Sequence, residues 1–321
     1  MMSVRFQSWN YLVAFLACAL LSALAFAIGQ MTFDSIPCKW RGYSADDFLA
    51  YCRSQRYADY EHGAFYYGLE PDIRSNVRNA KVLFLGSSKI QAAFSTNAVR
   101  SYFDKLRIDF FVMGFGYAES SRFALSVLQR SEATPRLLVI NADPFFTEHV
   151  SVPGQEAFDG GPAFLWRLAL KFTFQRVHRA ICFAAPFVCP ESEPAIFRSK
   201  RHGQWNWIGP YTAEKAVPFD GKFENSVPSE EIAKAINLGE RFLRDVGLNR
   251  ACVVITGTPN TFYDSVGIAQ TLAAALKTNS LFPSSAGLST LDGVHLNLAS
   301  AELWSGRFVE GLSPILNACL K

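Results

Sequence analysis

Short apolar runs, each followed by glycine or small polar residues, recur along the chain and predict buried β-strands. Four such runs are clear: KVLFL at 81–85, IDFFVM at 108–113, RLLVI at 136–140 and ACVVIT at 251–256. They are followed in turn by Gly-Ser-Ser, Gly-Phe-Gly-Tyr, Asn-Ala-Asp and Gly-Thr-Pro-Asn. Continuous apolar runs of this length are typical of parallel strands that are covered on both faces.

Helices are expected in the segments between and after these runs. Residues 118–130 and 229–248 carry apolar side chains at helical spacing, with Ser229 as the expected N-cap of the second helix, and 265–278 and 299–312 add two more. Strands that alternate with helices predict an α/β fold, in which a parallel sheet is flanked by helices. In such sheets ligands bind at the carboxyl ends of the strands, where all four polar loops are expected.

Two segments lie outside this alternation. Residues 32–80 are mixed and polar, and we interpret them as a linker and a packed extension. Residues 145–225 are rich in aromatics, proline and glycine and contain no clear strand, so we expect an insertion that packs over the sheet, with a lid as one role. Trp205 and Trp207 are expected to pack in a core, and stacking on a sugar is the alternative.

The N-terminal segment 11–29 contains 19 residues without a charge, a length that falls within the range of a transmembrane helix. Arg5 precedes it and Asp34 follows it, so the positive-inside rule places the rest of the chain outside the cytoplasm. A cleaved signal peptide is the alternative, because Ala25 and Ala27 are small residues at the positions that a signal peptidase reads. Residues 1–31 are therefore expected to be a membrane anchor or signal segment.

Export makes the cysteines relevant, because an oxidising compartment permits disulfides. The close pairs Cys38/Cys52 and Cys182/Cys189 are the natural candidates, whereas Cys252 lies in an apolar run and is expected to be a small buried residue. No cysteine or histidine spacing resembles a zinc site, and we expect neither a metal nor a cofactor. For four scattered histidines surface or core roles are expected: His62, His149, His178 and His202.

Composition places the chain among globular proteins, with 50% apolar and 18% charged residues. The net charge of +3 and the absence of a long basic run argue against nucleic-acid binding.

The Gly-Ser-Ser after the first strand raises the question of a nucleophilic serine. An unactivated hydroxyl is a poor nucleophile, so a histidine must take its proton and a carboxylate must orient that histidine. The segment LDGVHLN at 291–297 supplies both, with Asp292 three residues before His295 and just ahead of the last helix. The predicted catalytic residues are therefore Ser88, His295 and Asp292.

With these motifs the chain resembles the SGNH (GDSL-type) hydrolase superfamily. The resemblance covers roughly residues 81–144 and 250–312, and it implies a flavodoxin-like three-layer sandwich over 81–321, with 145–225 inserted. It assigns the nucleophile to Ser88 in Gly86-Ser87-Ser88, where Ser87 stands in the place of the family's usual aspartate. Asp292 and His295 match the family's last motif in spacing and position.

The resemblance also implies an oxyanion hole. The backbone N–H of Ser88 and a glycine after the second strand would donate to it; Gly116 is the first choice and Gly114 the second. The family's third motif, Gly-x-Asn-Asp, is altered: Asn141 has the right chemistry one position early, and Asp143 fits another register but cannot donate when ionised. Losing one such donor costs about two to three orders of magnitude in rate.

Within this superfamily, Gly-Ser-Ser with an N-terminal anchor resembles the envelope branch of D-alanyl transfer and polysaccharide O-acetylation proteins. That likeness implies a single-pass protein of the bacterial inner membrane whose catalytic domain lies in the periplasm or outside the cell. The expected function is a serine esterase or O-acyltransferase, with acetyl as the expected acyl group. It would act on an envelope or secreted polysaccharide, beside a membrane-bound O-acyltransferase. Two alternatives remain open, a catalytically weak or inactive glycan-binding or assembly subunit and a secreted lipase.

Overall fold

The computed structural model describes residues 3–32, 47–51, 57–142, 144–185, 196–207, 216–219 and 221–321. The central element is a five-stranded sheet in which every neighbouring pair is parallel. Its strands are β2 (Val82–Ser87), β3 (Phe110–Phe115), β4 (Leu137–Asn141), β8 (Val253–Thr256) and β9 (Asn279–Ser280). Their order across the sheet is β3-β2-β4-β8-β9. The four predicted strands are confirmed, and β9 is an addition.

Numbered along the chain, these strands are ordered 2-1-3-4-5. The connection direction reverses between β2 and β4, which makes the carboxyl ends of these two strands a topological switch point, where doubly wound sheets bind ligands. The register of β2 places Gly86 opposite Gly114 and Ser87 opposite Phe115 of β3. The sheet therefore brings the segment before Ser88 next to the loop that follows β3.

Helices cover both faces of the sheet, because alternate strand residues point to opposite sides and both sets are apolar. Val82 and Phe84 belong to one core, and Leu83 and Leu85 belong to the other. The first core also contains side chains of α4 (Ser88–Phe94), α5 (Asn97–Leu106) and α11 (Leu298–Leu320). The second contains side chains of α2 (Tyr57–Tyr67), α3 (Pro71–Asn79), α6 (Ser121–Ser131), α9 (Ser229–Val246) and α10 (Ser265–Leu276).

The helices agree with the predicted segments except in detail. The N-cap of α9 is Pro228, and Ser229 is the first helical residue, so the predicted N-cap was one position late. Helix α11 continues through Pro314 to Leu320, beyond the predicted end at 312. Residues 57–79 form α2 and α3, so the segment that we assigned to an extension holds part of the core.

The insertion contains strands, contrary to the sequence-based expectation. Helices α7 (Val152–Asp159) and α8 (Pro162–Ala184) come first, followed by β5 (Ile196–Ser199), β6 (Trp205–Trp207) and β7 (Val217–Pro218). Strand β5 pairs with both β1 (Phe48–Tyr51) and β6, while β7 pairs with β10 (Ser289–Thr290). Each strand is too short to leave a periodic signal. Trp205 is buried, as expected, and the side chain of Trp207 lies outside the described part.

Two of the contacts between the insertion and the sheet domain lie close to the predicted site. The turn between β5 and β6 covers β3, an edge strand, because the Val112 N–H donates to the His202 carbonyl at 2.8 Å. The His202 ring stacks on Phe110, with ring centroids 4.8 Å apart. Farther along, β7 pairs with β10, which lies immediately before the segment that contains Asp292 and His295.

Cys252 forms a disulfide with Cys319, so its expected role as a free buried residue was wrong. The bond joins the short helix that precedes β8 to the last turn of α11, across a sequence separation of 67. The pairing depends on how α11 returns along the sheet, which the local sequence around Cys252 does not reveal. Cys38, Cys52, Cys189 and the side chain of Cys182 lie outside the described residues, and so do their predicted pairings.

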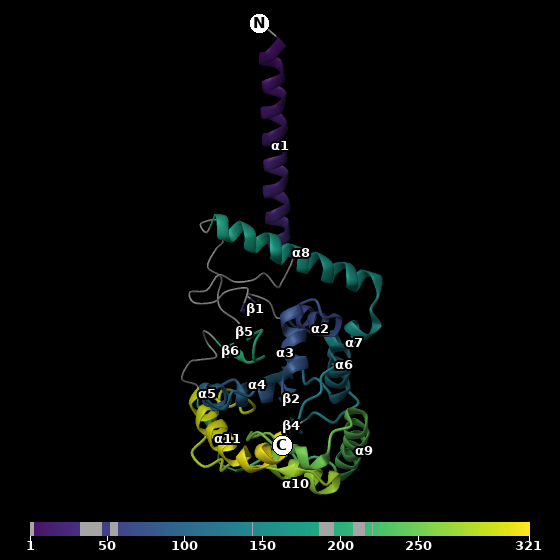
Figure 1. The fold of residues 1–321 in the computed structure, drawn as a ribbon, viewed down its shortest axis with the longest axis vertical. Coiled ribbons are helices and arrows are strands. Elements are labelled where there is room, and N and C mark those ends of the chain that lie inside the picture. Colours follow the sequence, from purple (N-terminus) through teal and green to yellow (C-terminus); the bar gives the residue numbers. More distant parts are fainter. Residues whose placement is uncertain are drawn as a thin grey trace.

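Helix α1 (Ser3–Thr32) projects from one end of the body, and α11 lies toward the other end (Figure 1). Large apolar side chains along α1 are exposed, among them Trp9, Leu12, Phe15, Leu20 and Leu24. When only the described residues are considered, no helix combines the length and the apolar character needed to cross a membrane.

Replacing both bonded cysteines, Cys252→Ser with Cys319→Ser, is expected to lower the free energy of unfolding by about 2–4 kcal/mol, because the denatured chain loses a long-range cross-link. Urea unfolding of the full chain measures the change. Cys18→Ser, at a free and exposed cysteine, is the control and should leave the midpoint unchanged. Equal stability of the double variant and the wild type would contradict a structural role for this disulfide.

The attachment at His202 predicts a pH-dependent stability. Burial, followed by the charge of Arg201, lowers the pKa of His202 from 6.5 to about 4. Between these values the unfolded chain binds a proton that the folded chain does not, so the free energy of unfolding falls as the pH falls through this window. His202→Phe keeps a ring against Phe110 and should flatten that decline in urea titrations between pH 7 and pH 4.5. His149→Phe, at an exposed position, is the control, and an equal slope in wild type and His202→Phe would argue against the assignment.

Candidate active site

Ser88 lies at the junction of β2 and α4, as the first residue of the helix. Ser87 is the N-cap, and its hydroxyl accepts a hydrogen bond from the Lys89 N–H at 3.3 Å. This bond occupies the Ser87 hydroxyl with the backbone, whereas Ser88 is half-buried and directs its hydroxyl to His295. The two neighbouring serines therefore have different roles, one local and one across the fold.

Ser88, His295 and Asp292 form one hydrogen-bonded chain. Ser88 Oγ lies 2.9 Å from His295 Nε2, and His295 Nδ1 lies 2.8 Å from Asp292 Oδ2. The two ring nitrogens thus contact different partners, as proton transfer from a serine to an oriented imidazole requires. The structure brings together the three residues that the sequence singled out, and their catalytic roles stay a prediction.

Hydrogen bonds within the Asp292–His295 segment hold the Asp292 carboxylate in place. The Asp292 carboxylate accepts backbone N–H bonds from Val294 at 2.9 Å and from His295 at 2.8 Å, besides the contact to the ring. Burial alone would raise the pKa of Asp292, but the hydrogen bonds and charge of His295 and the backbone N–H groups outweigh it and lower the pKa well below its usual value. Asp292 therefore stays ionised and can hold the His295 ring at neutral pH.

The predicted oxyanion residues lie at the carboxyl edge of the sheet, and their structural surroundings differ. Gly116 is buried in the turn directly after β3, and the next two residues, Tyr117 and Ala118, have left-handed backbones with φ of 61° and 53°. Left-handed non-glycine residues are costly and concentrate near functional sites. This turn therefore has a strained backbone at the carboxyl edge of the sheet, and the donor role of Gly116 stays a prediction.

Gly114 is closely packed within the sheet, and the side chain of Asn141 is hydrogen-bonded to a neighbouring loop. Gly114 lies within β3, where an added Cβ would come 2.6 Å from the Ser87 carbonyl oxygen, so its lack of a side chain permits close packing of β3 on α4. The buried Asn141 side chain donates to Thr258 Oγ1 and accepts from the Thr258 N–H, both at 3.3 Å. These bonds connect the end of β4 to the loop after β8. Asp143 lies outside the described residues.

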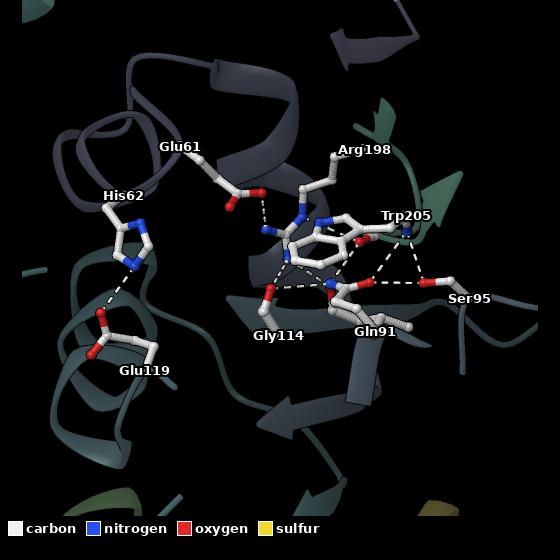
Figure 2. Close-up of polar contacts among 10 residues, drawn as sticks. Glu61, His62, Gln91, Ser95, Gly114, Glu119, Arg198 and Trp205 are labelled. Atoms are coloured by element: carbon white, nitrogen blue, oxygen red, sulfur yellow. Dashed lines mark hydrogen bonds and ion pairs between the residues drawn. The ribbon is translucent and has the colours of Figure 1, made fainter. Parts of the chain in front are cut away.

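A buried cluster that the sequence did not reveal surrounds β3 (Figure 2). The fully buried guanidinium of Arg198 pairs with Glu61 and donates to the carbonyl oxygens of Gly114 at 2.9 Å and Val112 at 3.1 Å. The Gln91 amide, from α4, donates to the same two carbonyls at 3.1 and 3.0 Å. An edge strand leaves carbonyls unpaired, and these two side chains satisfy them.

A second buried cluster holds the turn that contains Gly116 (Figure 2). His62 Nε2 lies 2.9 Å from Glu119 Oε2, and the Ser151 hydroxyl, at the N-cap of α7, donates to the same carboxylate oxygen. Burial would raise the pKa of Glu119, but the bonds from His62, Ser151 and the Ser120 N–H lower it. Ser151 and Glu119 both meet the same ring nitrogen of His62, unlike Ser88 and Asp292, which contact different ring nitrogens of His295.

Lys89 is a charged residue directly after Ser88. Its ammonium donates to the Tyr263 hydroxyl at 2.7 Å and lies 4.5 Å from the centre of that ring. Tyr263 in turn borders a cavity of about 510 Å³ at the end of β4, whose other walls include Pro144, Phe146 and Leu272. Within the described residues, no group of three or more histidine, cysteine, aspartate or glutamate side chains has the arrangement to bind a metal.

No protein-family model, curated protein or solved structure matches the chain. The interpretation of the site therefore rests on its own geometry.

Gly114→Ala tests the packing of β3 against the segment that contains Ser88. The added methyl would lie 2.5 Å from Ile90 Cγ2 and 2.6 Å from the Ser87 carbonyl oxygen, so the start of α4 must move. We expect a loss of about 1–3 kcal/mol in the free energy of unfolding and slower reaction of Ser88 with a fluorophosphonate. Gly161→Ala, where nothing lies within 4 Å of the new Cβ, is the control. Unchanged stability and reactivity of Gly114→Ala would show that this contact does not position Ser88.

Proposed function

We propose that the protein is a membrane-anchored, extracytoplasmic serine esterase or O-acyltransferase of SGNH type that acts on an envelope or secreted polysaccharide. The observation that carries the proposal is the hydrogen-bonded chain Ser88–His295–Asp292 at the carboxyl edge of the sheet. The strand order 2-1-3-4-5, typical of flavodoxin-like sheets, supports the same assignment.

The first half of the reaction forms an acyl-serine. His295 Nε2 takes the proton of Ser88 as the oxygen attacks the carbonyl carbon of an acyl ester, and Asp292 stabilises the resulting imidazolium. The backbone N–H groups of Ser88 and Gly116 donate to the oxyanion. When the carbonyl re-forms, the bond to the leaving oxygen breaks, and His295 returns its proton to that oxygen.

The second half regenerates the serine. Water or a sugar hydroxyl attacks the acyl carbon while His295 takes its proton, and Ser88 leaves with that proton restored. Attack by water gives hydrolysis, and attack by a sugar hydroxyl gives O-acylation. A membrane-bound O-acyltransferase is the proposed partner that presents the acyl group.

Two features support the proposed location. Residues 11–29 contain no charge, and the large apolar side chains described along α1 are exposed, which suits an anchor in the inner membrane. The Cys252–Cys319 disulfide suits an oxidising compartment such as the periplasm.

Fluorophosphonate labelling of the full chain in detergent micelles, with the adduct located by mass spectrometry, tests the serine chemistry. Labelling is expected at Ser88, and it should be lost in Ser88→Ala and His295→Ala. Asp292→Asn should slow it by roughly two to four orders of magnitude, because the imidazole loses its orienting carboxylate.

Ser87→Ala is the matched control, because it removes the adjacent hydroxyl and should retain labelling. Absence of labelling in folded wild-type protein would favour the non-catalytic glycan-binding or assembly role instead.

A further inference from the structure

Helix α8 has two opposite faces, and only one of them is covered by the described protein. Phe164 and Leu168 are buried, and Leu168 packs against Gly63 of α2. The other face is a stripe of exposed residues that recur every three or four positions along the whole helix. Its members are Trp166, Ala169, Thr173, Val177, Ala180 and Ala184. An exposed face of this composition, on a helix roughly 35 Å long, normally marks an interaction surface.

The two large apolar side chains of the α8 stripe are well exposed. Trp166 is 66% exposed and Val177 is 48% exposed, and five of the six members of the stripe are apolar. A soluble helix normally presents charged or polar side chains on its outer face. The α8 stripe therefore requires a partner that is itself apolar.

The charges of α8 indicate what that partner is. The helix contains Arg167, Lys171, Arg176 and Arg179 and no acidic residue. At the helical repeat the positions of Arg167 and Arg176 fall beside the stripe, whereas Lys171 is buried on the covered side; Arg167 pairs with Glu156 of α7 at 3.3 Å. An apolar stripe with arginine positions beside it and a tryptophan on it is typical of helices that lie in the plane of an anionic bilayer surface.

The position of α8 agrees with this interpretation. Figure 1 shows α8 at the end of the body from which α1 projects, with its axis running across that of α1. Helix α1, whose large apolar side chains are exposed, and helix α8, which carries the stripe, thus lie at the same end of the molecule. In a membrane, α1 would enter the acyl chains, and α8 would lie beside it among the lipid headgroups.

We propose that α8 lies in the surface of an anionic bilayer and contacts it through the stripe centred on Trp166 and Val177. The inference rests on the proposed membrane location but does not require the serine chemistry. It gives the insertion a membrane-contacting role in place of the lid expected from the sequence. A contact between α8 and the bilayer would also fix the orientation of the catalytic domain. With α1 as the sole contact, the domain would be free to rotate about the axis of that helix.

The test uses the full chain reconstituted in phosphatidylcholine vesicles, with and without phosphatidylglycerol, and lipids brominated near the headgroup as quenchers. Tryptophan emission should be quenched more strongly in wild type than in Trp166→Phe, and the difference should grow with phosphatidylglycerol. Hydrogen exchange of α8 peptides should slow at least several-fold in these vesicles relative to lipid-free detergent micelles.

Val177→Glu adds an acid to the stripe and should abolish both effects, while Leu303→Glu, at an exposed position of α11, is the matched control and should change neither. Carbonate extraction and Ser88 labelling are measured on the same samples. They report the anchor and the serine chemistry separately, and Val177→Glu should alter neither. Quenching equal to that of Trp166→Phe, or α8 exchange that is the same with and without lipid, would overturn the proposal. Protection that depends on protein concentration in the absence of lipid would also overturn it and indicate a second copy as the partner.

Discussion

The buried guanidinium of Arg198 is the contact on which the arrangement around β3 depends. It comes from the insertion, pairs with Glu61 of α2, and ends in the carbonyl oxygens of the edge strand. A buried charge is stable only when it is paired and hydrogen-bonded, and here one guanidinium pairs with one oxygen of a carboxylate and donates to two backbone oxygens. Three segments that are far apart in sequence are thereby held together, and β3 in turn positions the turn at Gly116. At the sheet edge beside Ser88, a buried ion pair and its hydrogen bonds therefore add to the packing of the apolar cores.

The candidate site combines two halves that fold by different means. The Asp292–His295 half is local, because a short segment satisfies its own carboxylate through backbone N–H groups. The other half is global, because Ser88 lies 207 positions away from His295 and reaches it only when α4 and the end of the sheet are in place. The disulfide at Cys319 and the two aromatic-rich cores hold these elements, so the distance between Ser88 and His295 reflects the whole domain rather than the site alone.

The structural features that could be predicted from the sequence are those with a regular apolar pattern or a short spacing between residues. Four strands were found because both of their faces are buried, which makes them continuously apolar. The Asp292–His295 pair was found because its spacing is local. By contrast, β9 (Asn279–Ser280) has two polar residues and no pattern, and α11 passes Pro314, a residue that normally marks a helix end. The Cys252–Cys319 bond and the Arg198 cluster depend on tertiary contacts between distant segments. Local patterns do not reveal the disulfide. For the Arg198 cluster, the adjacent Glu61 and His62 in an aromatic segment are the one local signal that could have suggested buried charges.

Two of the contacts of the insertion lie on either side of the candidate site. The contact at His202 lies on β3, next to β2, the strand that precedes Ser88, and the pairing of β7 with β10 lies just before Asp292 and His295. A displacement of these contacts would act on both halves of the candidate site, so the separation of Ser88 and His295 depends on how the insertion is seated.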